Sequence, residues 1–269
     1  MAAVSVVTPV SNGERYIEET IASVQAQSFE DWEYWIVDGN STDRTLELVR
    51  HHAALDPRIH YLSEPDRGMY DALFKGLERS HAPLCCWINA DDRFMPWAFE
   101  SAQRYMRATH AEWITGVAAY LDAKSVLHSV GAPKWYPRSL IRLGLFHGRC
   151  LGFIQQEGTF FSRALLEKVS PALINRVRAQ KVAGDFLFWA ALSQHTSLKT
   201  LPTVLAAFRI HDSNASAEVS AYYREVTQAG YPVPPGFLGQ IASVSVNPVL
   251  HAVGRFAAAR WRRRINTIS

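Results

Sequence analysis

Cysteine is scarce in this sequence, and the few cysteines are poorly placed for disulfides. Three occur among 269 residues, and two of them, Cys85 and Cys86, are neighbours in one apolar run. Neighbouring residues of a strand point to opposite faces, so these two thiols are badly oriented to pair with each other. Because an odd cysteine count without metal-type spacing is typical of reducing compartments, we expect a cytoplasmic protein.

Long hydrophobic runs and a strong charge bias are missing as well. No stretch approaches the roughly 20 apolar residues that span a bilayer. The first residues show no basic leader followed by an apolar segment, so we expect no signal peptide. The formal net charge is only +3, which argues against a protein that binds nucleic acid through its overall charge.

What the sequence does have is a regular alternation of strands and helices. Apolar β-branched or aromatic runs at residues 4–10, 34–37, 59–62 and 84–88 are separated by segments with helical spacing of apolar residues. Four strand–helix repeats in the first 92 residues predict a parallel, doubly wound α/β sheet with right-handed crossovers. Hydrophobic residues make up 48% of the chain, which is enough for a large core.

Acidic residues follow three of these four strands. Asp38 follows the second strand, Asp66 the third, and Asp91 and Asp92 the fourth. The carboxyl ends of parallel strands meet at one edge of the sheet, where open α/β sheets bind ligands. A hard cation relieves the repulsion between neighbouring carboxylates and often holds phosphates as well. A single Asp after a strand is more often a turn residue, but three strands that end this way predict a nucleotide and metal site.

The second half of the chain is less regular and carries two further candidate positions. Strands are expected at residues 113–117, 125–128 and 155–161. Asp185 opens an apolar helix, where it either caps the free N–H groups or serves as a general base. Arg209 and His211 are two residues apart, so they share a face if the strand before them continues.

Taken in chain order, these motifs resemble the family 2 glycosyltransferases, which have the GT-A fold. The motifs are VTPVSNGE at 7–14, VDGNSTDRT at 37–45, DRGMYDALFKG at 66–76, INADD at 88–92, QQEGTFF at 155–161, GD at 184–185 and FRIH at 208–211. The resemblance covers residues 1–215. It implies a GT-A domain there, with a Rossmann-like, mostly parallel central sheet flanked by helices. Beyond the resemblance, we expect residues 216–269 to form a linker and a C-terminal basic amphipathic helix.

The resemblance also implies an activity and a set of site residues. The reaction would be an inverting transfer of a sugar from a nucleoside-diphosphate sugar to a hydroxyl of a saccharide or a lipid-linked saccharide. Among the possible donors, a UDP-sugar is expected before any other. By resemblance Asp185 is the catalytic base, and Mn²⁺ or Mg²⁺ is held by Asp92 and His211. The residues that would contact the donor nucleotide are Thr8, Pro9, Asp38, Asp66, Arg67, Asp91 on the ribose side, and Arg209 at the diphosphate.

Three positions depart from the family pattern. Ser11 stands where many relatives have an aromatic residue, and Phe74 stands where Asn is frequent. Glu157 follows Gln156 where a small or apolar residue is commoner, so Glu157 competes as the base or as an acceptor contact. These departures concern details of recognition more than the type of reaction.

The C-terminal segment carries the local excess of basic residues. Apolar residues at roughly helical spacing lie beside an arginine cluster, namely Leu250, Val253, Ala257, Trp261 and Ile265 with Arg255, Arg260, Arg262, Arg263 and Arg264. Such a helix either lies on an anionic membrane surface at the inner face of the plasma membrane or docks on the domain with a solvated basic end.

The sequence is compatible with two other functions. A nucleotidyltransferase also has a Rossmann-like sheet with a metal carboxylate, but it usually has a glycine-rich basic phosphate loop after the first strand, and residues 8–14 contain one glycine and an acid. A non-catalytic sugar-nucleotide-binding subunit would keep the fold. The presence of both Asp92 and Asp185 argues against it.

Overall fold

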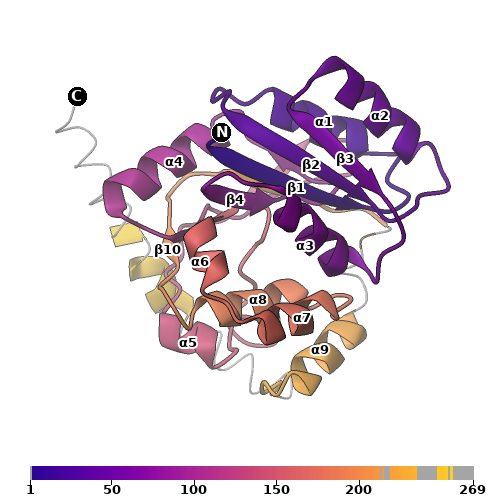
Figure 1. Ribbon diagram of the computed structural model, residues 1–269. Coiled ribbons are helices and arrows are strands. Elements are labelled where there is room, and N and C mark those ends of the chain that lie inside the picture. The colour runs from indigo at the N-terminus through magenta and orange to yellow at the C-terminus, as the bar shows by residue number, and fades with distance from the viewer. Residues whose placement is uncertain (1, 213, 215–218, 235–246, 254, 257–269) are drawn as a thin grey trace, which may run out of the picture.

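A seven-stranded sheet forms the centre of the computed structural model (Figure 1), which describes residues 2–212, 214, 219–234, 247–253 and 255–256. The strand order is β10-β6-β9-β4-β1-β2-β3. Its strands are β1 (Val4–Val10), β2 (Trp32–Asp38), β3 (Ile59–Ser63), β4 (Leu84–Trp87), β6 (Trp113–Thr115), β9 (Thr159–Ser162) and β10 (Lys199–Thr200). Strands β1 to β4 are parallel, whereas β9 runs antiparallel to both β4 and β6. The predicted α/β fold with a mostly parallel sheet is confirmed.

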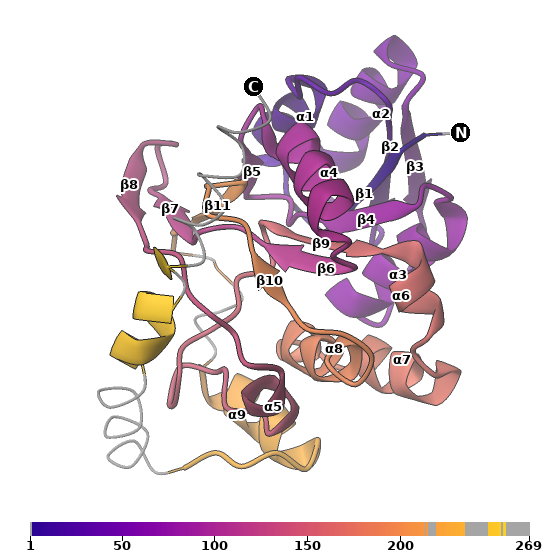
Figure 2. The ribbon, with the colours of Figure 1, turned by 90° about the vertical axis from the view of Figure 1, so that its left-hand side faces the viewer.

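Helices cover both faces of this sheet, as Figure 2 shows. One face carries α1 (Ile17–Gln25), α2 (Thr45–Leu55) and α4 (Ala98–Thr109), and the other carries α3 (Met69–Arg79), α6 (Arg163–Glu167), α7 (Pro171–Arg178) and α8 (Gly184–Leu192). The side chains of β1 alternate accordingly, because Val6 joins the core beneath α1 while Val7 joins the core beneath α3. Burial of both faces explains why these strands read as continuous apolar runs.

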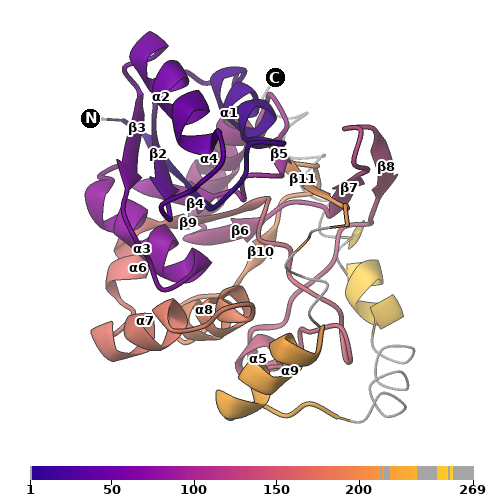
Figure 3. The ribbon, with the colours of Figure 1, turned by 90° about the vertical axis from the view of Figure 1, so that its right-hand side faces the viewer.

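A smaller sheet lies beside the central one (Figure 3). Its order is β5-β11-β7-β8, formed by β5 (Arg93–Phe94), β11 (Ala206–Arg209), β7 (Ala119–Leu121) and β8 (Leu127–Val130). Two further helices, α5 (Arg138–Arg142) and α9 (Val219–Gln228), lie below α8. The pairing of β5 with β11 brings residues after position 205 next to the segment that follows β4.

Some predicted boundaries differ from the structure for identifiable reasons. Helix α1 starts at Ile17 and not near Asn12, because the backbone N–H groups of Asn12 and Gly13 donate to the Ser41 and Thr45 hydroxyls instead of opening a helix. The strand expected over residues 155–161 begins at Thr159. Phe74, one of the departures from the family pattern, is buried edge-on against Phe188 at 5.6 Å, so it joins α3 to α8 in the core.

The described part of the C-terminal segment docks on the domain. Residues 247–253 and 255–256 are helical, and Leu250 is buried while its carbonyl accepts a hydrogen bond from the Trp135 N–H at 2.9 Å. The other predicted stripe and cluster residues, Ala257, Trp261, Ile265, Arg260 and Arg262 to Arg264, lie outside the described residues. Across the described part of the chain, no helix has the length and hydropathy of a membrane span.

Candidate active site

Asp38 lies at the carboxyl end of β2 and is held by two serines. Its carboxylate accepts hydrogen bonds from the Ser63 hydroxyl at 2.6 Å, from the Ser41 hydroxyl, and from the Ser41 N–H at 3.2 Å. These bonds fix the orientation of a buried carboxylate at the sheet edge.

Asp66 lies directly against the chain that follows Asp38. A Cβ atom on Gly39 would come within 2.5 Å of Asp66 Oδ2, so this close approach requires glycine. The other carboxylate oxygen of Asp66 accepts the Gly68 N–H at 2.7 Å. The structure therefore brings Asp38 and Asp66 together, as the topology predicted.

Arg67 borders this pair at the surface. Its side chain is 65% exposed and donates to Asp71 at 2.9 Å, while its carbonyl oxygen accepts the Lys181 ammonium. Asp71 also accepts Arg178 from α7 at 3.0 Å, and these bonds hold its pKa well below the ordinary value despite burial. The Arg67 guanidinium is thus anchored but still open to solvent.

Thr8 and Pro9 are buried in the last half of β1, and Pro9 lies one residue before the strand position that pairs with Asp38. The Thr8 hydroxyl donates to the Ile88 carbonyl and accepts from the Tyr34 hydroxyl, both at 2.8 Å, and the residue is fully buried. Pro9 is also buried and pairs in register with Val37. The Thr8 side chain thus joins β1, β2 and β4 in the core, and the expectation that Thr8 and Pro9 line the base and ribose pocket stays a prediction.

Asp91 and Asp92 point to different places. Asp92 is fully buried, and its Oδ1 accepts the backbone N–H of Arg209 at 2.7 Å. The Asp91 side chain is 26% exposed, and its Oδ2 lies 2.8 Å from His211 Nε2. Asp91 is therefore the carboxylate that meets His211 and retains solvent access, while the prediction that Asp92 and His211 hold the metal stays a prediction.

The environment of Asp92 favours its neutral form. Burial raises its pKa well above the ordinary value, and the negative charges of Glu157 and Asp91 raise it further. Its backbone carbonyl accepts the Thr20 hydroxyl of α1 at 2.8 Å. Asp92 is thus a buried acid that fixes the loop between β4 and β5.

The side chain of Arg209 is buried and joins three segments of the chain. Its guanidinium is fully buried and donates to the Asp91 carbonyl at 2.6 Å, to the Ser125 hydroxyl at 2.6 Å and to Glu19 at 2.9 Å. It also lies over the Tyr16 ring at 4.4 Å. Each of the three guanidinium nitrogens donates one of these bonds, and the contact of Arg209 with the diphosphate stays a prediction.

His211 is held from two sides. Its ring packs against Tyr16 at 5.0 Å, and its backbone N–H donates to Asn214 Oδ1 at 2.6 Å. Sequence reasoning missed Tyr16, Glu19 and Asn214 as parts of this site. Glu19 could have been noticed in the sequence because it is an acid in the first turn of α1, the helix that follows the first strand.

Asp185 lies in the first turn of α8 and accepts a hydrogen bond from the Tyr70 hydroxyl at 3.2 Å. Gly184 makes this contact attainable, since a Cβ there would come within 2.5 Å of the Tyr70 ring. Burial raises the pKa of Asp185 to about 6, an effect that the Phe186 N–H partly offsets. A carboxylate with a pKa near 6 is ionised at neutral pH but is basic enough to accept a proton.

Glu157 is a further buried acid of this region. It lies in the loop before β9, and burial raises its pKa to about 7, with further increases from the charges of Asp185 and Asp91. The structure thus brings together at one end of the sheet Asp38, Asp66, Asp91, Asp92, Glu157, Asp185 and His211.

Comparison with known proteins identifies the family. The sequence model of "Glycosyl transferase family 2" matches residues 5–169. The putative teichuronic acid biosynthesis glycosyltransferase TuaG of Bacillus subtilis is 38% identical over 105 residues, which is 38% of this chain and 41% of TuaG. An uncharacterised glycosyltransferase of Haemophilus influenzae is 25% identical over 222 residues, covering 80% of this chain and 67% of that protein.

Solved structures agree on the fold. Residues 1–349 of S. aureus TarS, in complex with UDP-GlcNAc, match with a TM-score of 0.64 and 17% identity over 85% of this chain and 65% of that one. The mannosyltransferase PcManGT from Pyrobaculum calidifontis, in complex with GDP-Man and Mn²⁺, matches with a TM-score of 0.60 and 19% identity over 94% of this chain and 69% of that one. The chain therefore has the GT-A fold and belongs to glycosyl transferase family 2.

Proposed function

We propose that this protein is an inverting, metal-dependent glycosyltransferase that moves a sugar from a UDP-sugar to a hydroxyl of a saccharide or lipid-linked saccharide. The observation that carries the proposal is Asp185: a buried carboxylate whose pKa is raised to about 6, held by Tyr70 at the start of α8, in the same acidic cluster as Asp91 and His211. The complex of TarS with UDP-GlcNAc and the teichuronic acid role in the name of TuaG support the donor and acceptor classes.

The nucleoside would lie at the ends of β2 and β3. Asp38 is fixed by serine hydroxyls and Asp66 by the Gly68 N–H, so both carboxylates are oriented before a ligand arrives. Preorganised acceptors suit the N–H and hydroxyl groups of a nucleobase and ribose. Arg67 is open to solvent at this border and would donate charge-assisted hydrogen bonds to a phosphate.

Asp91 and His211 suit a divalent cation. An exposed carboxylate oxygen and an imidazole nitrogen 2.8 Å apart are donors that Mn²⁺ accepts, and Mg²⁺ or Mn²⁺ commonly takes one or two protein ligands with substrate phosphates and water for the rest. Within the described residues, no group of three His, Cys, Asp or Glu side chains forms a fuller metal cage. When bound, such a cation supplies Lewis-acid stabilisation of the leaving diphosphate.

Asp185 would do the proton chemistry. It takes the proton of the acceptor hydroxyl while that oxygen attacks the anomeric carbon from the face opposite the diphosphate, and the bond from carbon to the diphosphate oxygen breaks. One displacement inverts the centre, so one base is sufficient. Tyr70, whose own pKa burial raises well above its ordinary value, stays a hydrogen-bond donor and orients the base.

A thermal-shift screen tests the proposal. UDP, GDP and CDP, each with and without Mn²⁺, are added to the full chain, because a ligand that binds the native state raises the melting temperature by mass action. The expected result is a rise with UDP that requires Mn²⁺. No rise with any of these nucleotides, with or without the cation, would refute the proposed function.

A further inference from the structure

A carboxylate on α9 holds the start of α8, the helix that carries Asp185. This carboxylate belongs to Glu225, and it accepts hydrogen bonds from three consecutive backbone N–H groups. They are the N–H groups of Lys181 at 2.8 Å, Val182 at 3.0 Å and Ala183 at 2.8 Å. Ala183 is the N-cap residue of α8 and has no polar side chain to cap the helix. A side chain from another element therefore fixes the chain just before the proposed base.

Apolar contacts join the same two helices. Ala183 and Phe186, one on each side of the base in the sequence, form a buried cluster with Val226 of α9. The Phe186 ring also lies 6.4 Å from the ring of Tyr222, which is on α9 as well. Burial of aromatic and aliphatic side chains is favourable, and aromatic pairs add a preferred geometry. Helix α9 thus supports the first turn of α8 by packing as well as by hydrogen bonds.

The position of the Asp185 carboxylate depends on this support. Asp185 is the second residue of α8, so its side chain moves with the helix start. The Tyr70 hydroxyl donates to it at 3.2 Å, which is long for a hydrogen bond between two oxygens. A bond of this length restrains the carboxylate weakly, so the backbone at the start of α8 determines where the base lies. Misplacing a catalytic group by about 1 Å can lower a rate ~10²-fold.

The proposed nucleotide side of the site is anchored separately. The Lys181 ammonium does reach this side, because it donates to the Arg67 carbonyl. Arg67 is also bound to Asp71, through its backbone N–H at 3.2 Å and its guanidinium at 2.9 Å, and these bonds do not involve residues 181–183. Asp38 is held by serine hydroxyls. Removal of the Glu225 carboxylate is therefore expected to leave UDP binding intact.

We propose that Glu225 is a positioning residue for the base, because it holds residues 181–183 and with them the start of α8 and Asp185. This inference rests on the proposed function and adds a residue to it. Glu225 lies beyond residues 5–169, which the family model matches, so membership of the family assigns it no role. Since Glu225 acts through Asp185 and not on the substrate, its loss should lower turnover and spare donor binding.

The test measures turnover and binding separately in Glu225→Ala. UDP-glucose, UDP-galactose, UDP-GlcNAc and UDP-GalNAc are compared on wild type in Mn²⁺, and release of UDP from the one that binds best gives kcat and KM. Loss of the carboxylate should lower kcat ~10²-fold and leave KM and the calorimetric Kd for UDP unchanged. Glu225→Gln should have an intermediate kcat, because its amide oxygen can still accept the N–H groups of Val182 and Ala183.

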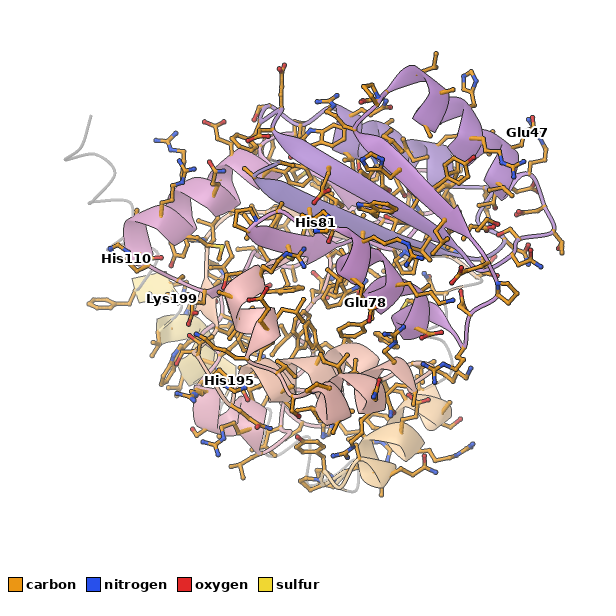
Figure 4. All side chains as sticks on the ribbon, in the orientation of Figure 1. Glu47, Glu78, His81, His110, His195 and Lys199 are labelled. Atoms are coloured by element: carbon orange, nitrogen blue, oxygen red, sulfur yellow. The ribbon has the colours of Figure 1, made fainter. Side chains whose placement is uncertain are left out.

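Glu33→Ala is the matched control. Glu33 of β2 is also a half-buried carboxylate that accepts consecutive backbone N–H groups, those of His81 at 2.6 Å and Ala82 at 3.0 Å, but it lies at the amino end of the sheet. His81, labelled in Figure 4, lies near β4 and apart from α9 at the lower right of the view. Both alanine variants should have lower melting temperatures, whereas only Glu225→Ala should lose turnover.

The outcomes separate this inference from the proposed function. Wild type that binds no UDP, or releases none from these sugar nucleotides, refutes the function itself. If wild type is active, an unchanged kcat in Glu225→Ala overturns only the positioning role. An equal loss of kcat in Glu33→Ala also overturns it, since the loss would then follow from lower stability, and so does a raised Kd for UDP in Glu225→Ala. If Glu225→Ala does not fold, Glu225→Gln decides: a lower kcat with an unchanged Kd for UDP supports the role, and a wild-type kcat overturns it.

Discussion

Asp185 is the residue on which the proposed chemistry depends most. Asp185→Asn preserves size and the contact with Tyr70 but removes the base, so turnover is expected to fall ~10²–10⁴-fold while UDP binding in Mn²⁺ is retained. Steady-state turnover and calorimetric UDP binding are measured on the same samples. Unchanged turnover in this variant would show that another group, such as Glu157, takes the proton.

The raised pKa of Asp185 also predicts the pH profile of the wild-type enzyme. A base whose folded pKa is about 6, above its ordinary value, is protonated and inactive below that pH and ionised above it. Turnover should therefore fall about tenfold for each pH unit below 6 and level off above 7. A profile measured from pH 5 to 8 that is flat through pH 6 would contradict the assignment.

The different orientations of Asp91 and Asp92 give a second prediction at the residue scale. Asp91→Asn should abolish the Mn²⁺-dependent part of the UDP thermal shift, because Asp91 meets His211 with solvent access. Asp92→Asn should retain it, since Asp92 is fully buried and already favours its neutral form. The opposite pattern would assign the cation to Asp92.

Among the secondary-structure elements, α8 depends on a contact with α3. A Cβ on Gly184 would come within 2.5 Å of the buried Tyr70 ring, so Gly184→Ala should destabilise the protein by about 1–3 kcal/mol and displace the start of α8. Thermal unfolding measures the effect. Gly131→Ala is the control, because its Cβ would come no closer than 3.4 Å to other atoms. Equal melting temperatures for the two variants would contradict this account.

The C-terminal helix presents a second face besides the one that docks. Val249, Val253 and Phe256 are exposed at spacings of four and three residues, whereas Leu250 is buried in the core. If this stripe contacts an anionic membrane, replacing the three exposed residues by Ser should reduce sedimentation with anionic vesicles several-fold and leave the melting temperature unchanged. Sedimentation equal to wild type would exclude this face as the contact.

Local patterns predicted the elements better than they predicted the site. The strands and helices of residues 4–92 are readable because their periodicities are local, and the topology alone gathers Asp38, Asp66 and Asp91 at one edge. Whether Asp91 or Asp92 turns inward depends on β11, since the Arg209 N–H that binds Asp92 comes from 117 residues further along the chain. The burial of the Arg209 guanidinium depends on Glu19, 190 residues away, and no local pattern reports that pairing.

At the scale of the whole molecule, the fold collects acids from distant elements at one end of the central sheet. Strands β2 and β4, helix α8 and the segment after β11 each contribute a carboxylate or an imidazole at the same end of the sheet. The family and the GT-A fold are consistent with this layout. In the proposed mechanism a single displacement uses Asp185 as its only base. The configuration at the anomeric carbon is therefore inverted in the product.

Proton NMR of the first sugar released from an α-linked UDP-sugar tests that claim most directly. The full chain with Mn²⁺ is incubated with the UDP-sugar that binds best, and the anomeric signal is followed before mutarotation. A direct displacement by water predicts the β anomer as the first product, and its release should be lost in Asp185→Asn. Release of the α anomer first, or equal release by Asp185→Asn, would contradict the mechanism.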